Sequence, residues 1–230
     1  MTDANDFFRF PHTPHLAWLG AGQPRDDKVL SAPEVKAFLA GPVVVEEKMD
    51  GANLGVSLDE EGNLVFQNRG QFLDLPYVGQ FARLPRWLES ESDKLFDALS
   101  PQLIAFGEWC AAQHSLEYTL LPNWWLVFDV YDREAGRFWS STRRNAWAKR
   151  YGLSTVPQVA SDACDLSQLK AILATHRSRY RSGPMEGIVV RSENGLWLQN
   201  RAKLVRADFT QSIGEHWRGR TIRWNRLSSS

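Results

Sequence analysis

One lysine in this chain has surroundings that favour nucleophilic chemistry. Lys48 lies in the segment Glu47-Lys48-Met49-Asp50-Gly51-Ala52-Asn53, which directly follows the β-branched run Val43-Val44-Val45. A lysine at the end of a buried strand can sit in a cleft where its amine loses its proton more easily, and the free amine is a nucleophile. On this segment alone, a solvated lysine before a turn is the simpler explanation, so the hypothesis depends on the rest of the chain.

Charged residues also stand beside other strand-like segments. They occur in Arg69-Gly70, Phe106-Gly107-Glu108-Trp109, Phe128-Asp129-Val130-Tyr131-Asp132, Glu186-Gly187-Ile188-Val189-Val190-Arg191 and Lys203-Leu204-Val205-Arg206. Acids and bases at the strand ends of an otherwise apolar sheet indicate a polar cleft rather than an ordinary surface. The sequence therefore predicts a cleft to which these segments contribute.

The charged residues have ordinary structural explanations as well. Arg69 can be a hairpin arginine. Glu108 and Glu186 can be ion-pair partners of Arg191 or Arg201. These alternatives stay open on the sequence alone.

The elements that would hold these residues follow from the periodicity of apolar residues and from turn residues. The pattern predicts helices over 31–39, 85–99, 142–151 and 167–180, and strands over 43–47, 54–58, 64–68, 103–109, 124–131, 187–191 and 196–199, the last extended by 203–206. No linker interrupts the chain. We therefore expect residues 1–230 to form one α+β domain of antiparallel sheets flanked by helices, with residues 1–30 as an extended arm and residues 207–230 as a basic C-terminal tail.

The composition is that of a globular protein. Of 230 residues, 43% are hydrophobic and 23% are charged, which excludes a disordered or fibrous chain. Lys plus Arg and Asp plus Glu both number 27, so the net charge is zero. Binding to nucleic acid through bulk charge is therefore not expected, whereas binding through a local patch stays open.

Targeting and redox signals are weak in this sequence. Two cysteines, Cys110 and Cys164, are too few for a disulfide framework and are interpreted as buried thiols. The first residues are polar and acidic, and no apolar run reaches the length of about 18 residues that a membrane helix needs. We expect a soluble cytoplasmic protein with no membrane partner, and the oligomeric state cannot be read from the sequence.

Taken in order, the motifs resemble those of the covalent nucleotidyltransferase superfamily, which contains polynucleotide ligases and mRNA capping enzymes. The nearest resemblance is to the RNA ligase family typified by phage nick-sealing RNA ligases, over about residues 43–209. Residues 107–118, Leu121-Pro122 and residues 128–132 are especially similar to that family, and Thr13-Pro14-His15-Leu16 also resembles it. The resemblance implies an ATP-grasp-like ligase adenylation fold, in this chain without an oligonucleotide-binding (OB) domain.

The resemblance also implies a role for each matching residue. Lys48 would attack the α-phosphate of ATP and hold AMP through a phosphoramidate bond. The nucleotide-binding residues would be Glu47, Asp50, Asn53, Arg69, Glu108, Phe128, Glu186 and Lys203. Glu47 and Asn53 would flank the adenine and the nucleophile.

The remaining roles divide between the sugar, the base, the metal and the phosphate. Arg69 and Glu108 would contact the ribose hydroxyls. Phe128 would stack on the adenine, which is worth about 1–3 kcal/mol, unless the strand register makes it a core residue. Glu186 would help to place Mg²⁺ or Mn²⁺, and Lys203 would contact the α-phosphate.

The chain departs from the family pattern in two ways. The last motif of related enzymes has two lysines one residue apart, and here Val205 occupies the second place after Lys203. Arg201 or Arg206 could supply the missing charge, and Arg201 shares a strand face with Lys203. Only 24 residues follow Arg206, which disfavours a capping enzyme or a full DNA ligase.

The C-terminal tail is rich in arginine. Arg218, Arg220, Arg223 and Arg226 are interleaved with Trp217 and Trp224. Basic residues alternating with aromatic residues suit a polynucleotide backbone and exposed bases. A solvated terminal helix is the alternative for this segment.

Together these features predict an ATP-dependent RNA ligase. It would join a 5′-phosphate to a 3′-hydroxyl through a lysyl-AMP intermediate and an adenylylated 5′ end. Two alternatives stay open, a minimal DNA nick ligase and a non-catalytic nucleotide-binding relative.

Overall fold

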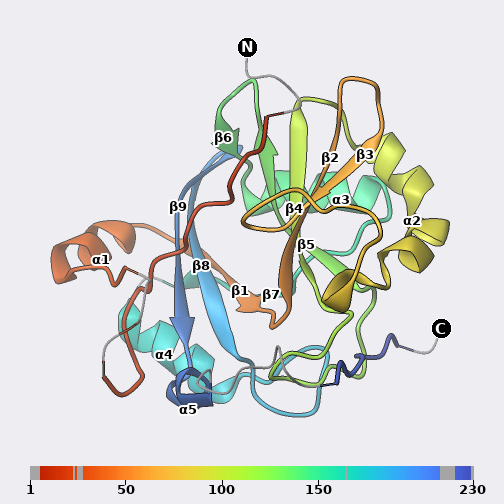
Figure 1. Cartoon of the computed structure of the whole chain (residues 1–230). Coiled ribbons are helices and arrows are strands. Elements are labelled where there is room, and N and C mark those ends of the chain that lie inside the picture. The colour runs from red at the N-terminus through yellow and green to blue at the C-terminus, as the bar shows by residue number, and fades with distance from the viewer. Residues whose placement is uncertain (1–5, 23, 25–27, 164, 213–220, 229–230) are drawn as a thin grey trace.

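The computed structural model describes residues 6–22, 24, 28–163, 165–212 and 221–228 (Figure 1). Its helices are α1 (Ala32–Phe38), α2 (Leu84–Ala98), α3 (Ser141–Arg150), α4 (Leu166–Thr175) and α5 (Ala207–Ser212), with a 3₁₀ turn, η1 (Gly79–Phe81). Its strands are β1 (Val43–Lys48), β2 (Ala52–Leu58), β3 (Leu64–Gln67), β4 (Leu103–Trp109), β5 (Trp125–Asp132), β6 (Arg137–Phe138), β7 (Gln158–Ala163), β8 (Gly187–Asn194) and β9 (Trp197–Val205).

The strands form two antiparallel sheets. One has the order β7-β1-β8-β9 and the other the order β3-β2-β4-β5-β6. The chain passes between the sheets directly after Lys48, where β1 ends and the turn into β2 begins. The predicted α+β class with antiparallel sheets is confirmed.

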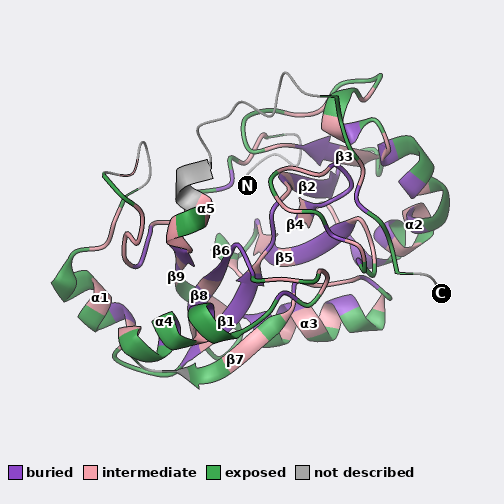
Figure 2. Cartoon of the chain, turned by 90° about the horizontal axis from the view of Figure 1, so that it is seen from below, coloured by how far each residue is buried: buried purple, intermediate pink, exposed green. Residues whose placement is uncertain are grey.

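Helices cover the outer faces of the sheets, and the central strands are largely buried, whereas the edge strand β7 is not (Figure 2). On the first sheet, Phe38 of α1 and Leu169 of α4 pack against Val45 and Ile188. On the second sheet, Trp87 of α2 joins a core that includes residues of β2, β4 and β5. Since the helices cover the outer faces, the two surfaces that face each other can form a site between the sheets. No helix among the described residues is long and apolar enough to span a bilayer.

The predicted helix over 167–180 is wrong in its second half. Helix α4 ends at Thr175, and a loop leads from it to β8. The backbone N–H of Arg179 donates to the carboxylate of Glu47 at 2.9 Å, and that of Ser178 donates to the carbonyl of Gly183 at 3.0 Å. These N–H groups are therefore not used for helical hydrogen bonds. Strands β6 and β7 were not predicted, because each is short or lacks an alternating apolar pattern.

The described part of the N-terminal arm lies along the edge strand β9. Leu16 donates from its backbone to the carbonyl of Lys203 at 2.8 Å, and Lys203 donates to the carbonyl of Pro14 at 2.8 Å. Further towards the N-terminus, Phe10 is buried between the sheets against Phe106 and Phe128. The arm thus protects a sheet edge and contributes a side chain to the space between the sheets.

A network of buried ion pairs joins the sheets. Arg191 of β8 donates to Asp129 of β5 at 2.8 Å, and Arg144 of α3 pairs with Glu46 of β1 at 2.5 Å. Arg201 of β9 pairs with the second oxygen of Asp129. All five side chains are at most 8% exposed. Since these charges are removed from water, each depends on its partners for stability.

We predict that Arg191→Met destabilises the protein by about 3–5 kcal/mol, because it leaves Asp129 and Glu46 with less compensating charge in the interior. Urea unfolding measures this loss. Lys28→Met is the matched control, since it breaks an exposed ion pair with Glu34 and should lower the stability far less. A similar small loss in both variants would contradict a structural role for the network.

Candidate active site

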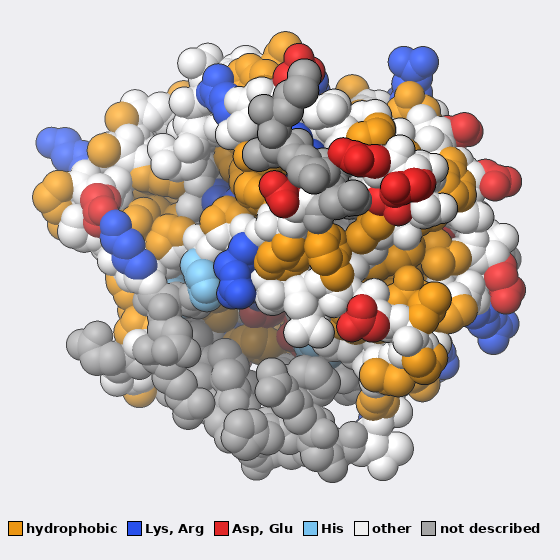
Figure 3. Space-filling model, turned by 45° about the horizontal axis from the view of Figure 1, so that its top comes forward, with side chains coloured by type: hydrophobic (Ala, Val, Ile, Leu, Met, Phe, Trp, Pro, Cys, Tyr) orange, Lys and Arg blue, Asp and Glu red, His pale blue; other side chains and the backbone are white. Residues whose placement is uncertain are grey.

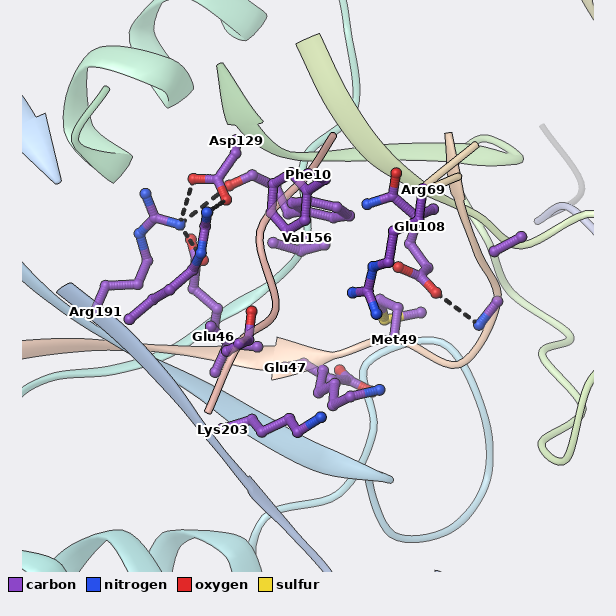
Figure 4. A pocket seen from close by; sticks show the side chains of 18 of the residues that line it. Phe10, Glu46, Glu47, Met49, Arg69, Glu108, Asp129, Val156, Arg191 and Lys203 are labelled. Carbon is purple, nitrogen blue, oxygen red and sulfur yellow. Dashed lines mark hydrogen bonds and ion pairs between the residues drawn. The ribbon is translucent and has the colours of Figure 1, made fainter. Parts of the chain in front are cut away.

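A pocket of about 520 Å³ lies between the two sheets. It is lined by residues of β1, β2, β4, β5, β8 and β9, together with the arm and the loop after β3. Asp129 and Arg191 lie at one end of the pocket and Arg69 and Glu108 at the other, with Phe10 and Val156 between them (Figure 4). The predicted polar cleft is thus present.

Lys48 enters this pocket from the last position of β1. Its Nζ donates to Oε1 of Glu186 at 2.6 Å. Glu186 directly precedes β8, and the register pairs Lys48 with the adjacent Gly187. A Cβ on Gly187 would lie 2.6 Å from the carbonyl oxygen of Leu204, so glycine permits the close approach of β9 at this point.

The turn after Lys48 is fixed by backbone hydrogen bonds. Oδ2 of Asp50 accepts from the N–H groups of Ser115 and Leu116 at 2.8 and 2.6 Å, and the N–H of Asp50 donates to the hydroxyl of Tyr118 at 2.9 Å. A Cβ on Gly51 would lie 2.5 Å from the carbonyl oxygen of Trp109, so this position requires glycine. Asp50 therefore locks the turn to the 115–118 loop and is absent from the pocket wall.

Several charges are crowded around Lys48. Burial alone would lower the pKa of its amine, but the negative charges of Glu186 and Glu108 outweigh burial and raise that pKa. Burial is also the main cause that raises the pKa of Glu108 to about 7 and that of Glu186 to about 8. In the free protein Lys48 is thus an ammonium held in an ion pair, and its amine must lose a proton before it can attack.

Glu108 and Asn53 face the pocket from neighbouring strands. They are directly paired across β2 and β4, so their side chains share one face of the sheet. Oε1 of Glu108 accepts from the N–H of Gly51 at 3.0 Å, and Oδ1 of Asn53 is buried without a hydrogen-bond partner among the described residues. Arg69 lines the same end of the pocket. Neither Glu108 nor Glu186 pairs with Arg191 or Arg201, so that alternative is wrong within the described part of the chain.

Phe128 reaches the pocket through an irregularity in its strand. Val127 pairs with Gly107, but Asp129 pairs with Phe106, so Phe128 is the additional residue of a β-bulge in β5. A bulge changes the direction in which side chains point. Phe128 and Asp129 both line the pocket, although adjacent residues of a regular strand face opposite sides.

Lys203 and Arg201 line the pocket from the same face of β9. Arg201 is ion-paired with Asp129, and its guanidinium lies 4.3 Å from the ring centre of Phe10. Val205 is buried, and Arg206 pairs with Asp208 at 3.0 Å. Of the two arginines considered for the second basic place of the last motif, only Arg201 lines this pocket.

Glu47 lies on the other face of β1 from Lys48, as strand alternation requires. Its Oε2 accepts from Arg179, while Oε1 is buried without a hydrogen-bond partner in the described residues. Burial raises the pKa of this carboxyl. The residue contributes to the pocket wall at the point where β1 ends.

The carboxylates suit a metal that is shared with a substrate. The described residues contain no cluster of three or more histidine, cysteine, aspartate or glutamate side chains that could hold a metal alone. Mg²⁺ is commonly held by one or two carboxylates together with substrate phosphates. Oε2 of Glu186 is buried without a hydrogen-bond partner among the described residues, so Glu186 fits such a ligand.

The C-terminal segment differs from a solvated helix. Arg218 and Arg220 lie outside the described residues, whereas residues 221–228 run against the 110–121 loop. Asn225 is 2% exposed, and its side chain donates to the carbonyls of Cys110 and Ala112 and accepts from the N–H of Tyr118. The alternative of a solvated helix is therefore wrong for residues 221–228.

The two described arginines of this segment contact the protein in different ways, Arg226 through its side chain and Arg223 through its backbone. Arg226 pairs with Glu117 at 3.1 Å on the surface. The carbonyl of Arg223 accepts from the N–H of Gln113 at 2.8 Å.

Cys110 is buried, which raises the pKa of its thiol well above the usual value, as expected for a structural cysteine. Cys164 lies outside the described residues.

Sequence reasoning missed part of the pocket wall. Phe10 and Thr13 come from the arm, and Gln80 comes from η1. The similarity of residues 13–16 to RNA ligases was a signal for the arm. Glu46 gave a further signal, because a carboxylate in a run of β-branched strand residues needs a buried partner.

Comparison with known proteins identifies the family. The family model for RNA ligases matches residues 41–205. No curated protein matches the chain. Among solved structures, a variant of the Naegleria gruberi RNA ligase with ATP and Mn is similar with a TM-score of 0.61 and 16% identity, covering 80% of this chain and 55% of that one.

Two further structures show the same fold. An archaeal ATP-dependent RNA ligase has a TM-score of 0.58 and 20% identity, covering 86% of this chain and 48% of that one. An Aquifex aeolicus protein described as an ATP-dependent DNA ligase has a TM-score of 0.56 and 21% identity, covering 87% of this chain and 50% of that one. The chain thus spans about half the length of these three proteins.

The three structures establish similarity of fold, and the sequence match supplies the family. It extends over residues 41–205, which is well over half of the chain, and includes Lys48, Glu108, Glu186 and Lys203. The chain belongs to the RNA ligase family.

Proposed function

We propose that this protein is an ATP-dependent RNA ligase that joins a 5′-phosphate to a 3′-hydroxyl. The observation that carries the proposal is the ion pair between Lys48 and Glu186, because Lys48 lines a pocket to which motif residues of both sheets contribute. The ATP-bound relatives have the same fold, which supports ATP as the substrate. Because ATP is an intracellular substrate, we place the reaction in the cytoplasm, where it would repair broken RNA.

The first step is transfer of AMP to Lys48. The amine loses a proton, and Oε1 of Glu186 is placed to accept it because it lies 2.6 Å from Nζ. Nζ then forms a bond to the α-phosphorus while the bond to the bridging oxygen breaks, and pyrophosphate leaves with that electron pair. Lys203 and Arg201 supply positive charge from β9 for the phosphates.

The other nucleotide contacts follow from the pocket walls. Phe128 offers its ring to the adenine from the bulge, while Glu108 and Arg69 lie at the end suited to the ribose. Asn53, with its unpartnered buried oxygen, and Glu47, with its unpartnered Oε1, would each accept a hydrogen bond from the nucleotide.

Glu186, together with the phosphates of ATP, would hold a divalent cation, Mg²⁺ or Mn²⁺, whose positive charge would stabilise the transition state. In the second step an oxygen of the RNA 5′-phosphate attacks the α-phosphorus and Lys48 leaves. In the third step the 3′-hydroxyl attacks the 5′-phosphorus and AMP leaves. These steps need a surface that holds RNA beside the pocket.

A DNA nick ligase is the second candidate, because the Aquifex aeolicus protein described as a DNA ligase shares the fold. The family match favours RNA. A non-catalytic nucleotide-binding protein is disfavoured, because it would have no need of a lysine ion-paired with a buried carboxylate in the pocket.

We predict that the protein, given ATP and Mg²⁺, seals nicked RNA faster than a DNA nick of the same sequence. Lys48→Ala should abolish sealing, because no amine remains to carry AMP. Lys48→Arg should also fail, because a guanidinium stays protonated and cannot attack. Sealing is measured by the length of a labelled strand on a gel. Faster sealing of DNA would favour the second candidate, and sealing by Lys48→Ala would contradict both.

We further propose that residues 221–228 support the nucleotide site. The contacts form a chain: Asn225 holds the backbone of Tyr118, the Tyr118 hydroxyl accepts from Asp50, and Asp50 fixes the turn after Lys48. Removal of residues 217–230 should therefore impair adenylation as well as RNA binding.

We predict that Asn225→Ala destabilises the protein by about 1–3 kcal/mol, because it leaves buried carbonyl and N–H groups unpaired. It should also slow AMP transfer to Lys48 severalfold at temperatures where the protein stays folded. Unfolding curves and labelled-AMP transfer measure the two effects. Glu117→Gln, which touches only the exposed pair with Arg226, is the control and should leave both unchanged. Unchanged transfer in Asn225→Ala would show that this segment has no part in the site.

A further inference from the structure

Arg83 is an arginine held in place by two tryptophans. Its guanidinium lies 5.0 Å from the ring centre of Trp124 and 4.2 Å from that of Trp224. Trp124 comes from the segment before β5 and Trp224 from the C-terminal segment, so three distant parts of the chain meet here. Two cation–π contacts restrict the guanidinium before any ligand arrives, which lowers the entropy lost on binding.

A groove of about 470 Å³ lies beside this arginine. Its walls include Arg83, the exposed Arg86 and Asn123. No carboxylate among the described residues lies within ion-pair distance of Arg83 or Arg86. The acidic residue in the wall, Glu91, is buried and paired with Lys94 at 2.9 Å. The groove therefore presents two uncompensated positive charges.

The local electrostatics agree with this description. The pKa of Arg83 is lowered, first by partial burial and then by the like charge of Arg86. The positive charge of Arg86 thus acts on Arg83. A negatively charged ligand in the groove would relieve that repulsion.

A short stretch of chain joins the wall of the nucleotide pocket to the wall of the groove. Gln80 lines that pocket and pairs with Nε2 of His114 at 2.8 Å. Arg83 follows Gln80 by three residues, so their Cα atoms are at most about 11 Å apart. On the neighbouring segment Ala112 pairs with Trp224. Residues 80–83 therefore run from the wall of the nucleotide pocket to the arginine that Trp124 and Trp224 hold.

We propose that this groove binds the sugar–phosphate backbone of the RNA strand next to the joining site, with Arg83 and Arg86 as phosphate ligands. The proposal rests on the proposed function. A guanidinium presents a fork of N–H donors that matches two oxygens of a phosphate. Phosphate contacts position a nucleic acid without reading its sequence, which a general ligase requires.

The overall charge of the molecule makes such a local site necessary. The net charge is zero, and the face shown in Figure 3 carries both acidic and basic side chains. Bulk attraction therefore cannot hold RNA near Lys48. Arg83, held by two tryptophans, and the exposed Arg86 lie within a few residues of Gln80 in the pocket wall and can hold the strand near the site where the adenylate is formed.

The test compares Arg83→Ala, Arg86→Ala and the double variant with Arg150→Ala, all in the full chain and pre-adenylated. Arg150 is a matched control, since it is an exposed arginine over the ring of Tyr151 at 5.5 Å on α3. Binding to a nicked RNA duplex is measured from low to moderate salt. Each groove substitution should weaken binding about tenfold and make the log–log salt slope shallower by about 0.7–0.9 for each arginine–phosphate pair that the substitution removes.

AMP transfer to Lys48 should be unchanged in all four variants, because none of these arginines lines the nucleotide pocket. Arg86→Ala is decisive if Arg83→Ala unfolds, because the side chain of Arg86 is exposed. Affinity and slope equal to those of Arg150→Ala in either folded variant would overturn the proposal. If the unaltered protein does not take up AMP, the proposed function fails instead.

Discussion

The two sheets of this protein are held together by charge in its interior. Asp129 of β5 receives Arg191 and Arg201 from the opposite sheet, and Glu46 of β1 receives Arg144 of α3. Charges removed from water are tolerated only when each has its partners in good geometry. The network therefore fixes the distance and orientation of one sheet relative to the other. That relation places Lys48, which ends a strand of the first sheet, opposite Glu108 of the second.

The same constraint determines the chemistry of the pocket. Glu186 and Glu108 surround one ammonium in a buried space, so burial raises the pKa of both carboxyls and their charges raise that of Lys48. The free protein keeps its nucleophile protonated and paired. A metal and the phosphates of ATP would change this balance of charge around Lys48. The amine therefore stays unreactive until the substrate binds. Asn225 holds the 115–118 loop, and this loop keeps the turn after Lys48 in position when the charges in the pocket change.

The motif residues could be predicted from the sequence because each is a charged residue at the end of an apolar strand. Lys48, Glu108 and Lys203 all line the pocket, and Glu186 contacts Lys48. The position of Phe128 could not be predicted, because it depends on a bulge that only the pairing of β4 with β5 reveals. The packing of residues 221–228 could not be predicted either, since arginines interleaved with tryptophans suggest a surface that binds nucleic acid, whereas the buried Asn225 holds this segment against the 110–121 loop. The length of helix α4 was overestimated, because residues after its end donate their backbone N–H groups to Glu47 and to the carbonyl of Gly183 instead of forming helical hydrogen bonds.

The most direct test of this account is to locate the covalent adduct. The full chain is incubated with ATP and Mg²⁺, digested and examined by mass spectrometry. The account predicts one AMP on the peptide that contains Lys48, labile in acid because the bond is a phosphoramidate. AMP on another residue, or no adduct from protein with a native melting curve, would contradict the account, because the ion pair with Glu186 would then mark a structural contact and not a nucleophile.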